Sequence, residues 1–137
     1  MPIPAYPKSK IVTLNPFYMK TLVIGATDKT DRYAYKAVDL LLKNHHEVVG
    51  LGRQEGEVLG VKILNGKPDL KGIDTVTLYV GPDHQPAYYD YILALKPRRV
   101  IFNPGTENPA FEELIHKQGG IEAIEACTLV MLTVGNY

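Results

Sequence analysis

The sequence is poor in the features that mark secreted, membrane-spanning or nucleic-acid-binding proteins. Its single cysteine, Cys127, excludes an intrachain disulfide framework and fits a reducing compartment. No apolar run approaches the ~18 residues of a membrane span, and the N-terminus lacks the basic head and apolar stretch of a signal peptide. Positive and negative side chains balance at 15 each, so no global basic field attracts nucleic acid or anionic lipid. We therefore expect a cytoplasmic protein without nucleic-acid or membrane partners.

Common catalytic and metal-binding motifs are also missing. His45 and His46 are adjacent, whereas His84 and His116 stand alone, so no metal-ligand spacing occurs. There is no Gly-x-Ser-x-Gly nucleophile elbow and no GxxxxGK[ST] phosphate loop, which argues against ordinary nucleotide hydrolysis. Cys127 lies beside an apolar run, where a thiol is more typical of a small buried side chain than of a nucleophile. These absences favour a protein that is not an enzyme.

What the sequence does contain is a regular alternation of short apolar runs and amphipathic segments. Its 137 residues indicate one domain. Residues 1–19 are rich in proline and predict an N-terminal arm, in which 11–17 could form an edge strand. Residues 20–137 are predicted to form the folded domain. The strand-like runs are 20–25, 46–52, 75–80, 99–103 and 121–126, the last of them at an edge. This alternation predicts an α/β fold, with a mostly parallel sheet of five or six strands and helices on both faces.

The segments between the strands have the spacing of amphipathic helices. Asp31 is expected to cap the first helix, whose apolar stripe is Ala34, Ala37, Val38, Leu41 and Leu42. The second helix is expected to begin at Asp83. Its core-facing residues are expected to be Ala87, Tyr91, Ile92 and Leu95. The third carries Phe111, Leu114 and Ile115 on one face.

In open parallel sheets a ligand lies beyond the carboxyl ends of the strands. The loops at that edge are 25–33, 52–56, 81–84 and 103–108. The first offers backbone N–H groups at a helix start, the Thr27 hydroxyl and the cations Lys29 and Arg32, unless it is a plain turn with its charges in water. It has one glycine, Gly25, where the dinucleotide fingerprint needs three.

The second loop narrows the choice of ligand. A site for NAD places an acidic residue at the end of the second strand, but Arg53 stands there. The planar guanidinium suits a phosphorylated ribose, as in NADP or coenzyme A (CoA), although a solvated loop charge is the alternative. In the third loop Gly81 lets the backbone approach a flat ring, or Pro82 simply initiates a helix. The fourth loop could contact a ligand or merely turn.

Several motifs, in this order and spacing, match a known family. They are G-x-T-x-K-x-D-R-Y over Gly25–Tyr33, H-E-V over His46–Val48, D-T-V-T-L-Y-V-G-P over Asp74–Pro82, and P-G-T-E-N-P over Pro104–Pro109. The chain from Lys20 onward resembles the CoA-binding domain family. These are small stand-alone proteins similar to the N-terminal domain of the succinyl-CoA synthetase α subunit.

This resemblance implies a three-layer Rossmann-like fold with CoA lying across the strand ends. By likeness, phosphate would be cradled by Gly25, Ala26 and Thr27, with Lys29, Arg32 and Tyr33 near the ligand and Arg53 near the 3′-phosphate or the diphosphate. Adenine would be flanked by Val80, Gly81 and Pro82, and the floor lined by Asn103, Pro104 and Gly105. Family members often carry Asn-Pro where this chain has GRQEG, and a glutamine that FNPGTEN lacks. The synthetase uses a phosphorylated histidine of a second domain, so the resemblance carries binding and not ligase activity.

Three functions remain open at this point. The first is binding of CoA or an acyl-CoA by a non-catalytic domain that acts as a carrier, sensor or accessory subunit. The second is an NADP-binding oxidoreductase or redox sensor, although no substrate domain is present. The third is a protein-interaction module whose nucleotide site has decayed. Tyr88, Tyr89 and Tyr91 leave room for a homodimer, because tyrosine is enriched at interfaces.

Overall fold

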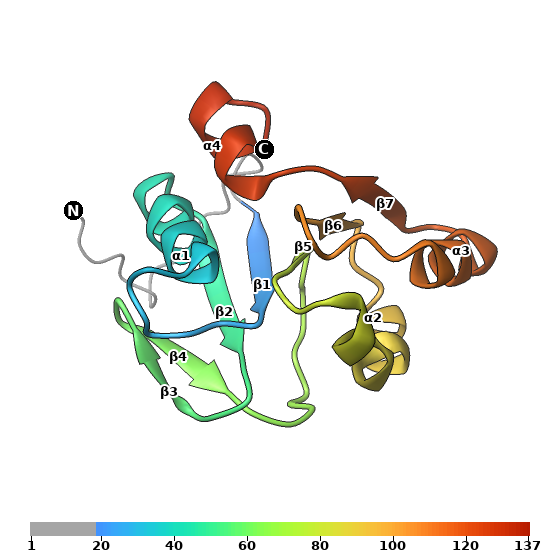
Figure 1. Ribbon diagram of the computed structural model, residues 1–137, viewed down its shortest axis with the longest axis horizontal. Coiled ribbons are helices and arrows are strands. Elements are labelled where there is room, and N and C mark those ends of the chain that lie inside the picture. Colours follow the sequence, from blue (N-terminus) through green and yellow to red (C-terminus); the bar gives the residue numbers. More distant parts are fainter. Residues whose placement is uncertain (1–18) are drawn as a thin grey trace.

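A single seven-stranded sheet organises the protein, in a computed structural model that describes residues 19–137 (Figure 1). The strands are β1 (Lys20–Ile24), β2 (Glu47–Leu51), β3 (Gly56–Val58), β4 (Val61–Leu64), β5 (Thr75–Leu78), β6 (Arg99–Phe102) and β7 (Glu122–Glu125). Their order is β3-β4-β2-β1-β5-β6-β7, and every pair is parallel except β3–β4. Without β3, this is the strand order of a doubly wound nucleotide-binding fold. The expected arm and the strand at 11–17 lie outside the described residues, except for Met19.

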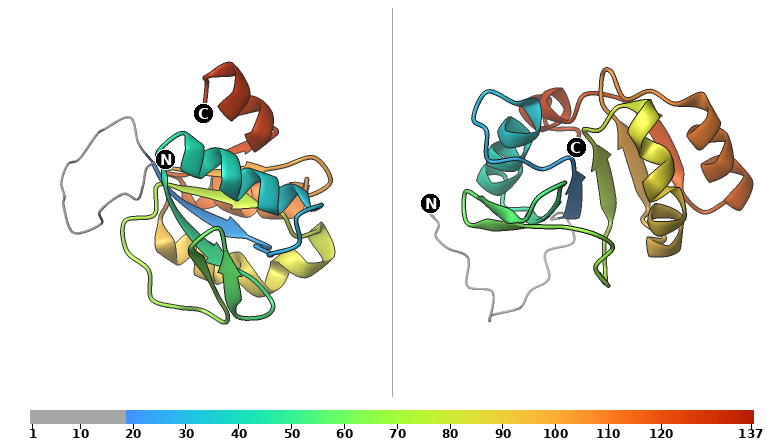
Figure 2. Two further views of the ribbon diagram at one scale, coloured as in Figure 1. Left: turned by 90° about the vertical axis from the view of Figure 1, so that its left-hand side faces the viewer. Right: turned by 60° about the horizontal axis from the view of Figure 1, so that its bottom comes forward.

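Helices cover both faces of the sheet, as the sequence pattern predicted (Figure 2). One face carries α1 (Tyr33–Lys43) and α4 (Thr128–Val134), and the other the 3₁₀-helix η1 (Pro82–Tyr88) with α2 (Tyr89–Leu95) and α3 (Pro109–Gln118). Side chains alternate across each strand, so Val23 packs under α1, whereas Leu22 and Ile24 join the cluster of α2 and α3. Within residues 19–137, no helix has the length and apolar character needed to cross a membrane.

The sheet has more strands than expected because β3 and β4 form a short antiparallel hairpin at one edge. The turn is made by Leu59 and Gly60, both with positive φ, of 52° and 84°. Two consecutive residues in this conformation suit the right-handed twist of a tight hairpin. The prediction of five or six strands is therefore wrong, whereas the predicted edge strand is confirmed as β7.

Two details of the helices also differ from the prediction. Asp31 does not cap α1: the Arg32 N–H bonds to the Lys29 carbonyl in a turn, and Arg32 becomes the N-cap without a side-chain bond. The second predicted helix divides into η1 and α2, and Ala87 is exposed rather than inward. Pro86 lies inside η1, and its missing N–H disfavours a continuous α-helix there.

Candidate functional site

The carboxyl ends of β1, β2 and β5 meet at the point where the strand order reverses. Gly25 follows β1 with φ of 98°, and a Cβ there would lie 2.8 Å from the Tyr79 carbonyl oxygen. Gly52 follows β2, and its Cβ would lie 2.6 Å from the Ala26 carbonyl oxygen. Any side chain at these positions would push the loops apart. Both glycines therefore let three loops converge at the place where open α/β sheets bind ligands.

The start of the first loop is fixed to the end of β2. The N–H groups of Gly25 and Ala26 both donate to the Leu51 carbonyl oxygen, at 2.8 and 3.1 Å. These donors are engaged within the protein, so a phosphate would have to be held by later groups of the loop. Thr27 is half-buried, and its hydroxyl oxygen accepts from the Lys29 N–H at 3.2 Å, which leaves the hydroxyl proton free to donate.

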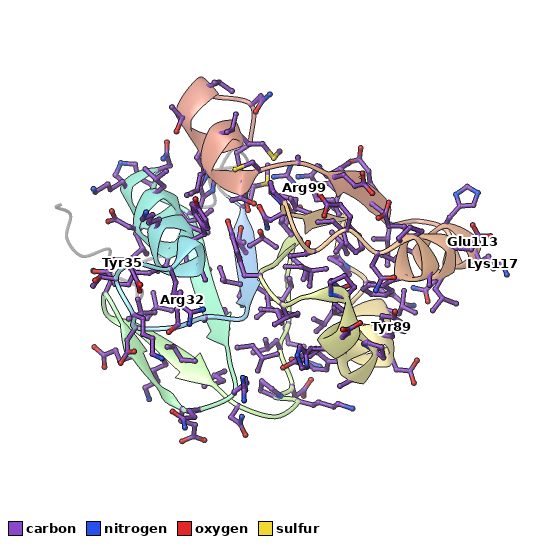
Figure 3. The ribbon with its side chains drawn as sticks, viewed as in Figure 1. Arg32, Tyr35, Tyr89, Arg99, Glu113 and Lys117 are labelled. Carbon is purple, nitrogen blue, oxygen red and sulfur yellow. The ribbon has the colours of Figure 1, made fainter. Side chains whose placement is uncertain are left out.

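The later part of this loop carries two cations, Lys29 and Arg32, beside the exposed Asp28 and Asp31. The first N–H groups of a helix have no partner within the helix. No side chain caps the N-terminus of α1 and no acidic residue lies in its first turn, within the part of the chain that the structure describes. Lys29 and Arg32 are exposed beside it, with Arg32 visible on the loop in Figure 3. Tyr33 is 67% exposed, with the Lys36 ammonium over its ring. This end of α1 can attract an anion.

A hollow of about 340 Å³ lies at the same edge of the sheet. Its lining comes from the loops after β2 and β4 and from η1, and consists of Arg53, Asn65, Gly66, Lys67, Ala87 and Tyr88. The Asn65 side-chain amide donates to the carbonyls of Gly52 and Arg53, at 3.0 and 2.9 Å, and holds two of these loops together. The sequence predicted Arg53 but missed Lys67. Lys67 lies in the NGKP turn that follows β4. This turn can be assigned to the carboxyl edge only once β4 is known to run parallel to β2.

The third loop has open space beside its glycine. Gly81 has an ordinary φ of −68°, so its backbone does not require glycine. A Cβ at Gly81 would have no atom within 4 Å. Val80 is half-buried against the core, and Pro82 is exposed as the first residue of η1. A flat group can therefore approach the backbone here, and the adenine position stays a prediction.

A buried amide joins the third and fourth loops. Gln85 is fully buried and donates to the carbonyls of Val80 and Thr106, at 3.0 and 2.8 Å. Its oxygen accepts from the Asn108 side-chain amide at 2.9 Å, and Asn108 in turn caps α3 by accepting from the Phe111 N–H. The sequence analysis missed both residues. Asn-Pro before a helix is a readable cap signal, whereas nothing in the sequence distinguishes Gln85.

The fourth loop offers a ligand fewer free polar groups than its composition suggests. The Asn103 side chain is 98% buried: its amide donates to the Thr77 hydroxyl and the Leu78 carbonyl, and its oxygen accepts from the Thr128 N–H. All of these bonds are internal, so Asn103 shapes the loop and has no amide group left for a ligand. The exposed residues of this loop are Pro104, Gly105 and Glu107, and the Gly105 N–H donates to the Glu107 carboxylate at 2.9 Å.

Four cations at the carboxyl edge form no ion pair among the described residues, although the same loops also carry exposed carboxylates such as Asp31 and Glu55. The ion pairs among residues 19–137 use the cations Lys20, Lys43, Lys71 and Arg98. None of Lys29, Arg32, Arg53 and Lys67 takes part in one, and all four are exposed. Cations that already face water bind an anion without first breaking a protein ion pair.

The tyrosines proposed for a dimer are used within the domain. Tyr89 stacks on Phe111 with ring centroids 4.2 Å apart, and the Tyr91 hydroxyl donates to the Pro68 carbonyl. Tyr88 packs against the same core and lines the hollow. The homodimer stays a prediction without support from these residues. Cys127 is half-buried at the N-terminus of α4.

Comparisons with known proteins agree with this geometry. The sequence matches the CoA binding domain family over residues 19–133. A crystal structure described as an uncharacterized protein is 52% identical, with a TM-score of 0.85 over 88% of this chain and 98% of that one. Two further structures share the fold. A hypothetical protein from Pyrococcus horikoshii OT3 is 24% identical, with a TM-score of 0.75 over 83% of this chain and 81% of that one. A protein from Thermus thermophilus is 22% identical, with a TM-score of 0.76 over 88% of this chain and 91% of that one. No curated protein matches the sequence. The chain belongs to the CoA-binding domain family, as its motifs predicted.

Proposed function

We propose that this domain binds CoA or an acyl-CoA across the carboxyl ends of β1, β2 and β5, without a catalytic role of its own. The observation that carries the proposal is the group of four exposed, unpaired cations at this edge. CoA is strongly anionic, with a phosphate on its ribose and a diphosphate in its chain. Cations that have no other partner in the described residues are free to bind those groups.

In this proposal the phosphoadenosine end of CoA lies nearest the hollow. A volume of about 340 Å³ is at the low end for ligand pockets, so it suits part of CoA and leaves the pantetheine arm outside. Arg53 and Lys67 would bind the 3′-phosphate, and the open space beside Gly81 would receive the adenine ring. The diphosphate would lie near Thr27 and the uncapped N-terminus of α1.

The lining of the hollow supports binding more than catalysis. Apart from its two cations it offers an amide, a phenol, a methyl group and glycine backbone, from Asn65, Tyr88, Ala87 and Gly66. None of these is a nucleophile next to a general base, the usual arrangement for covalent catalysis. We therefore propose a carrier, sensor or accessory subunit, with a cytoplasmic location as the sequence predicts.

The test is thermal unfolding of the protein with excess CoA, dephospho-CoA, NAD and NADP, each measured separately. A ligand that binds only the folded state at 100 times its Kd adds roughly 2.7 kcal/mol to stability. In a domain of this length we expect the midpoint to rise on the order of 5–10 °C with CoA, and less with dephospho-CoA. A rise with NADP alone would replace this proposal with a redox function. No rise with any of them would favour an interaction module without a nucleotide.

A further inference from the structure

A row of polar residues crosses the opposite end of the sheet, on the face covered by α1 and α4. Thr21 pairs in register with Thr75, and Thr75 with Arg99, near the amino ends of β1, β5 and β6. All three are buried, with exposed fractions of 0%, 0% and 5%. Apart from Lys20 and the buried Thr77, the other residues of these strands are apolar, so this row forms a polar strip within the core. Figure 3 shows Arg99 beside α4, away from Arg32 and the carboxyl edge.

The guanidinium of Arg99 makes only some of the hydrogen bonds that it can donate. Its Nε donates to the Thr75 hydroxyl at 2.9 Å, but its Nη2 is buried and has no hydrogen-bond partner among the described residues. In the neighbouring Arg98 the same two nitrogens are both paired. Its Nε and Nη2 donate to the two carboxylate oxygens of Asp74, at 2.9 and 3.1 Å. Arg99 feels the charge of Asp74, which its own charge helps to keep at a lowered pKa, but it makes no direct hydrogen bond to that carboxylate, whose oxygens bond to Arg98 and to the Thr75 hydroxyl.

Tyr137 covers this group. The Arg99 Cζ lies 4.4 Å from the centre of the Tyr137 ring, and the Tyr137 hydroxyl hydrogen-bonds with the Thr21 hydroxyl. The ring of His46 packs on the same tyrosine, with centroids 4.9 Å apart. We call these residues the Arg99 pocket: Thr21, His46, Thr75, Arg99 and Tyr137. The ring of Tyr137 faces the guanidinium as a cation–π partner and supplies no negative charge.

The cover is attached to α4 by a short exposed link. Gly135 ends α4 in the left-handed conformation, with φ of 80°, and Asn136 follows it, exposed like Gly135. The Asn136 N–H donates to the Met131 carbonyl at 2.9 Å, so displacement of Tyr137 would have to come from rotation after that bond or from its loss. Removing Tyr137 from the pocket would free the Thr21 hydroxyl and open the Nη2 of Arg99.

A buried guanidinium with an unpartnered Nη2 and no directly bonded anion is an unusual and costly arrangement, because charge removed from water needs a paired charge or complete hydrogen bonding. We propose that the Arg99 pocket is an anion-binding site closed by Tyr137, and that it takes the carboxylate or phosphate group of a small ligand when Tyr137 moves out. The anion would accept from Arg99 Nη2 and from the Thr21 hydroxyl. This site lies at the other end of the strands from the proposed CoA site and does not depend on it.

The experiment measures binding of inorganic phosphate and of acetate by titration calorimetry, at constant ionic strength set with chloride. The proteins are the wild type, Tyr137→Ala, and Tyr137→Ala combined with Arg99→Gln. We expect saturable binding by the wild type and tighter binding by Tyr137→Ala, because the wild type is competent only while Tyr137 is displaced. Adding Arg99→Gln should weaken binding at least about tenfold. The tighter of the two probes identifies the group as phosphate or carboxylate.

A matched control is Lys117→Gln in the Tyr137→Ala protein, which removes the same charge from an exposed position on α3. It should leave anion binding unchanged. If Arg99→Gln does not fold, Thr21→Val serves instead, since it keeps the side-chain shape and removes the hydroxyl, and should weaken binding several-fold. The proposal is overturned if Tyr137→Ala shows no saturable binding, or if binding is unaffected by loss of Arg99 or of the Thr21 hydroxyl. It is also overturned if only Tyr137→Ala binds, because Tyr137 would then be a fixed part of the core.

Discussion

The two ends of the sheet use positive charge in opposite ways. At the carboxyl ends, Arg53 and its neighbouring cations are exposed and have no ion-pair partner among residues 19–137. At the amino ends, Arg98 is bound to Asp74 and Arg99 is buried beneath Tyr137. An exposed cation contributes little to folding and stays available to a ligand, whereas a buried or paired cation is part of the folded structure. Substitutions at the two ends should therefore separate binding from stability.

The largest effect is expected where the carboxyl edge depends on a close approach of two loops. Gly25→Ala should lower the free energy of unfolding by about 3 kcal/mol, because it adds strain at positive φ to a clash with the Tyr79 carbonyl. Gly105→Ala is the matched control: φ is 92°, but a Cβ there would meet no atom within 4 Å. Its loss should be about 1 kcal/mol, from backbone strain alone. Urea unfolding measures both, and equal losses would show that the clash at Gly25 relaxes.

The next effect should appear in binding and not in stability. Arg53→Gln should weaken CoA binding about tenfold or more, because it removes a charged partner of the proposed 3′-phosphate. Dephospho-CoA should bind the variant and the wild type almost equally, and the unfolding free energy should change by less than about 0.5 kcal/mol. Calorimetric titration with both ligands checks this, with Lys117→Gln as the charge-matched control. Equal losses for the two ligands would place Arg53 away from the 3′-phosphate.

At the amino end of the strands we expect a smaller effect, which should appear in stability and not in binding. Arg98→Gln should lower the unfolding free energy by about 1 kcal/mol, since the Arg98–Asp74 pair is bidentate but partly exposed. Binding of CoA should not change. The same substitution should raise the pKa of Asp74: burial works against its ionisation, but the hydrogen bonds from Arg98 and Thr75 outweigh this and hold the pKa below its ordinary value. Urea unfolding and a carboxyl titration by NMR measure the two effects. A loss of CoA affinity would contradict the separation of the two ends.

The smallest effect concerns pH. Burial, and then the nearby charge of Arg99, lower the pKa of His46 from its ordinary value of 6.5. The unfolded chain then binds more protons than the folded one, so stability should be lost as pH falls from 6.5 toward the lowered pKa. His46→Asn keeps an acceptor for the Met19 N–H, which now bonds to Nδ1, and removes this titration. Its unfolding midpoint should change less between pH 7 and pH 5 than that of the wild type. His116→Asn, at an exposed position, is the control. If the unfolding midpoint of His46→Asn depends on pH as strongly as that of the wild type, the pH dependence does not come from His46.

Much of the fold can be predicted from the sequence because its central strands are short, largely apolar runs and α1 has a clear apolar stripe. The β3–β4 hairpin was not predicted, because β3 has only three residues, of which only Val58 is apolar and buried, and β4 is interrupted by the exposed Lys62. Its turn places Leu59 at positive φ, a conformation that leucine rarely adopts and that no sequence rule assigns to it. Missing β4 also hid Lys67, because only the parallel pairing of β4 with β2 brings the following loop to the carboxyl edge.

Residue type at a strand end predicts where a side chain lies, but not which way its polar groups point. Arg53 was expected near a phosphate because it follows β2 at the carboxyl edge, and it does line a hollow there, whereas its contact with a phosphate stays a prediction. The family resemblance placed Asn103 at the ligand floor, yet its amide bonds to Thr77, Leu78 and Thr128, which are distant in sequence. The N–H groups of Gly25 and Ala26 are likewise claimed by Leu51, a residue of the next strand. Such pairings arise only when the elements are packed together.

The buried amide of Gln85 has a consequence for the kinetics of ligand capture. Because it is bonded to the loops after β5 and β6 at once, and to Asn108 at the start of α3, these loops are ordered before any ligand arrives. Their entropy is lost during folding, so association needs no loop closure and incurs little further ordering. Association rates should then depend on ionic strength, through the exposed cations, more than on any internal rearrangement. A free and a CoA-loaded crystal of this domain should superpose closely along both loops.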